Sequence, residues 1–114
     1  MGARTNFELQ DYKGSVWLYS HWGGDTKAND LALALEHAEP RWGDTSYAMR
    51  MVVSYLMKDN LMGDTGYGIS SYELGEESYE PISVNFSTNT VSYQDIAYTF
   101  GEFVTFFARG RVNA

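Results

Sequence analysis

The chain contains no cysteine, which excludes disulfides, zinc–thiolate sites and cysteine nucleophiles. No apolar run approaches the roughly 20 residues that a membrane-spanning helix needs. The opening stretch, MGARTNFELQDYKG, also lacks the apolar segment that is typical of a secretory signal. These absences predict a cytoplasmic protein that makes no contact with a membrane.

Basic residues are missing from nearly half of the sequence. The 114 residues include 15 acids and 8 bases, which gives a net charge of −7. Lys58 is the last base before Arg109, and the interval between them holds eight acids: Asp59, Asp64, Glu73, Glu76, Glu77, Glu80, Asp95 and Glu102. A field of one sign repels nucleic acid and attracts a basic protein. The alternative explanation is that the charge only keeps the protein soluble.

The residues that are present predict one folded domain, 1–114, with 1–14 and 111–114 as candidate flexible ends. Hydrophobic residues make up 44% of the chain and aromatic residues 16%, too many for a disordered sequence. β-branched and aromatic residues bounded by turn signals predict strands. The expected strands are a short edge strand at 6–9, a strand at 15–22, another at 66–74 and a hairpin over 81–94.

Three segments show the apolar spacing of amphipathic helices, namely 25–38, 43–60 and 99–110. The last begins with Thr99 and Glu102 in the T-x-x-E arrangement of a capping box. The order of strands and helices predicts an α+β fold. We expect a mostly antiparallel sheet of four to five strands, with about three helices packed on one face.

The triplet Gly-Asp-Thr occurs three times, with its aspartates at Asp25, Asp44 and Asp64. A phosphate cradle is one reading, but an aspartate would place negative charge where the anion binds, and no P-loop lysine follows. A carboxylate metal site would require the three loops to converge. We therefore predict that the first two triplets cap helices and the third shapes a turn, with no metal and no cofactor.

A second candidate site is a small-ligand or nucleotide pocket formed by His21, Trp22, Arg41 and Tyr67. His21 ends a strand beside two glycines, where an imidazole can exchange a proton near neutral pH. Trp22 and Tyr67 could stack on a ring, and Arg41 could contact an anion. A structural histidine is the alternative. No nucleophile motif accompanies His21, so catalysis is not the favoured prediction.

The favoured site is instead an acidic binding surface formed by Glu73, Glu76, Glu77 and Glu80. The chain also has nine tyrosines, three tryptophans and five methionines, residue types that are favoured at protein interfaces. Tyrosine beside carboxylates suits a basic protein groove and does not suit nucleic acid, because phosphate contacts need cations. Self-association through the same aromatic residues is a further hypothesis.

The stretch VWLYSHWGG, then Arg41, Trp42 and Asp44, then GDTGYGIS and a VNF–VSY hairpin resembles small uncharacterised proteins of bacteriophages and prophages. The resemblance covers about residues 15–95 and implies a genomic setting. By analogy, that setting implies an accessory protein that binds and inhibits a basic host protein, such as a nucleic-acid-binding defence complex.

Overall fold

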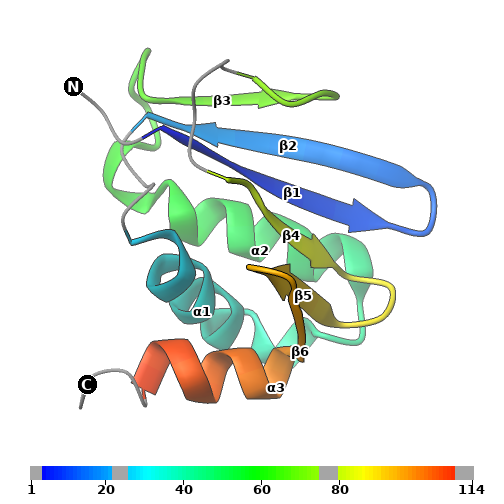
Figure 1. Cartoon of the computed structure of the whole chain (residues 1–114). Coiled ribbons are helices and arrows are strands. Elements are labelled where there is room, and N and C mark those ends of the chain that lie inside the picture. Colours follow the sequence, from blue (N-terminus) through cyan, green and yellow to red (C-terminus); the bar gives the residue numbers. More distant parts are fainter. Residues whose placement is uncertain (1–3, 22–25, 75–79, 110–114) are drawn as a thin grey trace.

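The computed structural model describes residues 4–21, 26–74 and 80–109. These residues form a six-stranded sheet with the order β3-β2-β1-β4-β5-β6 and helices on one face (Figure 1). Only the β1–β4 pairing is parallel among the five pairings of this sheet; the others are antiparallel. The predicted α+β class, mostly antiparallel sheet and three helices are therefore confirmed.

The strands are short and joined mainly by hairpins. Their bounds are β1 (Thr5–Asp11), β2 (Gly14–Ser20), β3 (Tyr67–Ser70), β4 (Ile82–Asn85), β5 (Thr90–Tyr93) and β6 (Ile96–Thr99).

Three helices cover the sheet, and short 3₁₀ turns follow the first two. Their bounds are α1 (Lys27–His37), η1 (Glu39–Arg41), α2 (Thr45–Leu56), η2 (Lys58–Asn60) and α3 (Phe100–Phe103). The chain continues from α3 as a π-helix, η3 (Val104–Arg109), and Figure 1 draws the two as one helix.

Alternation along the strands places the core between the sheet and the helices. Phe7 and Leu9 of β1 are buried, and their register partners on β4, Ile82 and Val84, are buried as well. Apolar side chains of the helices meet them, because residues three and four apart share a helix face. The helical part of the core consists of Leu31, Ala32, Ala34, Leu35, Ala38, Ala48, Val52, Phe100, Phe103, Val104 and Ala108.

On the other face of the sheet β1 carries polar side chains, and Leu74, which follows β3, lies against part of this face. Glu8 lies at the centre of this face, where its carboxylate accepts hydrogen bonds of 2.7 Å from the hydroxyls of Ser15 and Ser83. Asn6 is fully buried there, and its amide group donates to the carbonyl of Leu74 and accepts from the N–H of Leu74. The side chain of Asn6 thus holds Leu74 on the sheet.

Two strand predictions need correction. The strand predicted at 6–9 is not at an edge: β1 lies between β2 and β4, so most of the candidate flexible segment 1–14 is a central strand and a hairpin. A sixth strand, β6, had no counterpart in the prediction, which expected four to five strands. Residues 111–114 lie outside the described part of the chain.

Candidate functional site

The outermost strand, β6, is positioned by a two-residue turn. Gln94 and Asp95 connect β5 to β6, and both have left-handed backbone conformations, with φ of 52° and 67°. Positive φ at both central residues is the signature of a type I′ turn, whose twist matches that of the flanking strands. The turn fixes the register of β6 against β5, with Tyr93 opposite Ile96 and Val91 opposite Tyr98.

This register decides which backbone groups of β6 point outward. The N–H of Phe100 donates to the carbonyl of Asn89 at 3.0 Å, which makes the pair just beyond the strand a hydrogen-bonded one. Hydrogen-bonded and non-hydrogen-bonded pairs alternate in an antiparallel ladder. Ile96 and Tyr98 therefore bond to β5, whereas the N–H and C=O of Ala97 point away from the sheet.

Thr99 also has an outward N–H, but a capping box occupies it. This N–H donates to the Glu102 carboxylate at 2.9 Å, and the N–H of Glu102 donates to the Thr99 hydroxyl at 3.1 Å. The predicted capping box is thus confirmed. Within the described part of the chain, no residue bonds to the outward N–H and C=O of Ala97, which leaves one donor and one acceptor at this edge.

An apolar groove of about 720 Å³ runs between β6 and the helix formed by α3 and η3, beside the outward N–H and C=O of Ala97. Ile96 and Phe106 line it with side chains that remain 52% and 61% exposed. The rings of Phe106 and Tyr98, which both line it, lie 6.3 Å apart. The complete lining is Ile96, Ala97, Tyr98, Gly101, Glu102, Thr105 and Phe106.

Two further hollows continue the groove, and carboxylates line both. A hollow of about 470 Å³ shares Ile96 and Ala97 with the groove, and one of about 400 Å³ shares Gly101 and Thr105. Among the described side chains that line the three hollows there is no lysine and no arginine. The carboxylates that line them are Glu36, Glu39, Glu80, Asp95 and Glu102. We call this surface, the groove with its two hollows, the β6 edge.

The acidic residues singled out in the sequence divide between two parts of the molecule. Glu80 precedes β4 and lines the hollow beside Asp95, so it belongs to the β6 edge. Glu73 is exposed and follows β3, the strand at the opposite edge of the sheet. Glu76 and Glu77 lie outside the described residues. The predicted acidic surface thus contributes one described carboxylate, Glu80, to the β6 edge.

The residues of the predicted ligand pocket do not all come together. The N–H of His21 donates to the carbonyl of Gly66 at 2.9 Å, next to Tyr67, and its Nδ1 lies 3.2 Å from the Tyr19 hydroxyl. Arg41 lies beyond the far end of α1, where its guanidinium is 3.8 Å from the Asp44 carboxylate. Trp22 lies outside the described residues. The structure therefore brings His21 near Tyr67 and leaves Arg41 apart.

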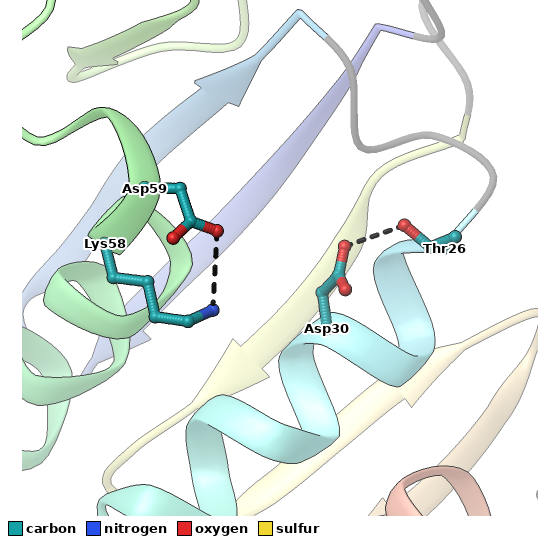
Figure 2. A network of polar contacts seen from close by, with 4 residues as sticks. All are labelled: Thr26, Asp30, Lys58 and Asp59. Atoms are coloured by element: carbon teal, nitrogen blue, oxygen red, sulfur yellow. Dashed lines mark hydrogen bonds and ion pairs between the residues drawn. The ribbon is translucent and has the colours of Figure 1, made fainter.

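The corner around Tyr67 is acidic. Burial raises the pKa of the Tyr67 hydroxyl, and the negative charge of Asp30 and then of Asp59 raises it further, while a hydrogen bond with Ser20 lowers it. Figure 2 shows Asp30 at the start of α1, hydrogen-bonded to Thr26 at 2.8 Å, and Asp59 after α2, 4.0 Å from the ammonium of Lys58. Two carboxylates make this corner a poor site for an anionic ligand.

The first two Gly-Asp-Thr triplets precede helices but do not make the predicted capping hydrogen bonds, and the third precedes β3. Thr26 and Asp44 occupy the N-cap positions of α1 and α2, but neither side chain accepts a bond from its helix. Thr26 donates to Asp30 instead, and Asp44 pairs with Arg41. The capping role was therefore right about position and wrong about mechanism. Asp25 lies outside the described residues.

The triplets also form no metal site in the described structure. Asp44 directly precedes α2 and Asp64 follows η2, and no group of three potential metal ligands occurs among the described residues. In the same described parts, every helix is too short or too polar to cross a bilayer.

The sequence placed one residue of the β6 edge, Glu80, in the predicted acidic surface, but the strand itself was not predicted. The segment Ile96–Thr99 has only four residues, and its two-residue turn lacks the glycine or asparagine that usually marks a hairpin. The alternation of Ile96 and Tyr98 was the available signal.

Comparisons of this chain with protein-family models, with curated proteins and with solved structures found no match.

Proposed function

We propose that this is a small acidic accessory protein of the phage type that binds a basic host protein and inhibits it. A nucleic-acid-binding defence complex in the host cytoplasm is the kind of target that fits. The observation that carries the proposal is the β6 edge, where carboxylates line an apolar groove and its two adjoining hollows and no described base does. The inhibitor would occupy a basic groove that otherwise holds nucleic acid.

The charge and the groove contribute differently to such binding. Carboxylates around the rim steer a basic partner and raise its association rate, and this contribution weakens as salt screens it. Exposed Phe106 and Ile96 supply the apolar area that an interface core needs. Direct binding of nucleic acid is disfavoured, because the phosphates would meet carboxylates.

Two triple variants with the same net charge test whether the β6 edge is responsible. The first, Glu80→Gln with Asp95→Asn and Glu102→Gln, neutralises three exposed carboxylates at this edge. The second, Asp59→Asn with Asp64→Asn and Glu73→Gln, neutralises three exposed carboxylates near β3. Each keeps side-chain size and hydrogen-bonding capacity and changes the net charge from −7 to −4.

The assay captures basic proteins from host lysate on the immobilised protein at low salt and identifies the one that is released at high salt. The purified partner is then tested for loss of its nucleic-acid binding when the wild-type protein is added. We expect the first variant to lose most of the affinity and inhibition, and the second to keep most of both. Equal effects of the two variants would show that net charge alone, and not the β6 edge, governs the interaction.

A further inference from the structure

We propose that the β6 edge takes an extended basic segment of its partner, which pairs with Ala97 through two backbone hydrogen bonds. This inference rests on the proposed function and specifies how the partner is held. The juxtaposition behind it is an open donor and acceptor at Ala97, an apolar groove on the helix side, and carboxylates that line the groove and its two adjoining hollows.

The register of β6 determines which backbone contacts an added segment can make. An extended segment beside β6 can donate to the C=O of Ala97 and accept from its N–H, as one hydrogen-bonded residue pair of a ladder does. Recognition by strand addition draws affinity from such main-chain bonds. The neighbouring N–H of Thr99 is held by Glu102, so the contact is restricted to Ala97 and cannot slide along the edge.

The alternation of side chains along an extended segment determines which of them reach the groove. Every second side chain of a segment beside β6 points to the helix side of the sheet, where the groove lies. An aliphatic residue there would pack against Phe106 and Ile96, whose exposed area it would remove from water. The residues on either side of it would reach the rim of the groove and the two adjoining hollows.

The carboxylates of the β6 edge favour a basic segment as the occupant. Asp95 and Glu80 line the hollow at one end of the groove, and Glu102 lines the groove itself. Lysine or arginine next to the aliphatic residue would meet these carboxylates. A second copy of this chain would instead bring its own carboxylates against the same set, and like charges across an interface oppose association.

The experiment uses two labelled heptapeptides of equal charge as probes. One alternates lysine with valine; the other alternates lysine with proline, which has no N–H and cannot pair as a strand. Fluorescence anisotropy gives the affinity of each for the full chain. We expect the valine peptide to bind about tenfold more tightly, because only it can form the two bonds and fill the groove.

Variants at Ala97 test the backbone contact directly. Ala97→Pro removes the outward N–H without removing a bond to β5, and proline is tolerated where an edge-strand N–H faces solvent. Ala97→Val is the control, since it keeps the N–H and favours a strand. The valine peptide should bind Ala97→Pro no better than the proline peptide does, and should bind Ala97→Val like the wild type.

A matched pair of exposed aromatic residues tests the groove. Phe106→Ser should weaken the valine peptide several-fold, whereas Tyr47→Ser, which alters a comparably exposed ring on α2, should have no effect. Amide hydrogen exchange gives a readout that does not depend on substitution. Adding the valine peptide should slow exchange at Ala97 and leave Ile96 and Tyr98, which already bond to β5, unchanged.

Each contrary result has a separate meaning. Equal, salt-sensitive binding of both peptides, with no slowing at Ala97, would overturn strand pairing and leave the proposed function standing. Absence of binding by either peptide, even at low salt, would overturn this inference and count against the proposed function too. Concentration-dependent dimers with Ala97 protected in the absence of peptide would show that a second copy is the occupant.

Discussion

Thr99 and Glu102 exchange hydrogen bonds at the start of α3: the Thr99 hydroxyl accepts from the Glu102 N–H at 3.1 Å, and the Glu102 carboxylate accepts from the Thr99 N–H at 2.9 Å. The pair begins the helix and at the same time removes one outward donor from the exposed edge of β6. Local helix capping and the shape of the β6 edge therefore depend on the same two side chains.

The capping box predicts that substitutions at its two positions change stability by different amounts. Thr99→Ala should lower the free energy of unfolding by about 1 kcal/mol, because the Glu102 N–H loses its acceptor. Glu102→Gln should leave stability nearly unchanged, since glutamine also serves in a capping box. Urea denaturation measures both. A large loss with Glu102→Gln would mean that its charge, rather than its hydrogen bond, stabilises the helix start.

The turn between β5 and β6 should be open to improvement. Gln94 has φ of 52° without being glycine or asparagine, and a left-handed conformation costs an ordinary residue roughly 1 kcal/mol. Gln94→Asn should therefore raise the free energy of unfolding by a few tenths to about 1 kcal/mol. Tyr12→Asn, at an exposed position of the β1–β2 turn without positive φ, is the control and should change stability little. Thermal and urea denaturation would both show the difference.

This turn also explains why one strand of the sheet could not be predicted from the sequence. The buried alternation of Ile82, Val84 and Phe86 follows from local pattern, and the hairpin was predicted from it. The strand after Gln94 was not predicted, because these turn residues give no local signal. The parallel pairing of β1 with β4 could not be predicted either, because the paired residues are far apart in sequence. The acidity of the β6 edge was visible in composition, but the outward N–H of Ala97 depends on a register that only the folded sheet defines.

Asn6 should be the most sensitive polar residue of the sheet. Its amide makes two hydrogen bonds with the backbone of Leu74, of 2.7 and 3.2 Å, in a fully buried position. Asn6→Ala leaves the carbonyl and N–H of Leu74, which is partly buried, without these partners, and this should cost about 1–3 kcal/mol of stability. Gln10→Ala, a partly exposed position on the same face of β1, is the control and should cost far less.

The Asn6 substitution also has a local readout. Amide hydrogen exchange at Leu74 should become faster in Asn6→Ala relative to amides in the centre of β1, because the N–H of Leu74 loses its acceptor. Unchanged protection of Leu74 would mean that other contacts hold Leu74 in place and that Asn6 contributes little to it.

Lys27 gives the protein a pH dependence whose sign can be worked out. Its side chain is only 5% exposed, its ammonium donates to the carbonyl of Glu80, and it lies 3.4 Å from the hydroxyl of Thr5 and 6.0 Å from the centre of the Tyr93 ring. Burial lowers the pKa of Lys27 below its ordinary value of 10.5, and the charge of Glu80 opposes this shift only in part. Charging Lys27 is thus less favourable in the folded protein than in the unfolded chain.

Between the folded pKa of Lys27 and pH 10.5, the unfolded chain binds more protons, so stability should rise with pH, by at most about 1.4 kcal/mol per pH unit. Tyr67 acts in the opposite sense, because its raised pKa makes stability fall once the pH passes its ordinary value of 10.0. Urea denaturation from pH 7 upward should therefore show a rise that Lys27→Met abolishes and the exposed control Lys13→Met retains. The fall at higher pH should be reduced in Tyr67→Phe. Parallel pH profiles for the wild type and Lys27→Met would show that the burial of this ammonium does not shift its protonation.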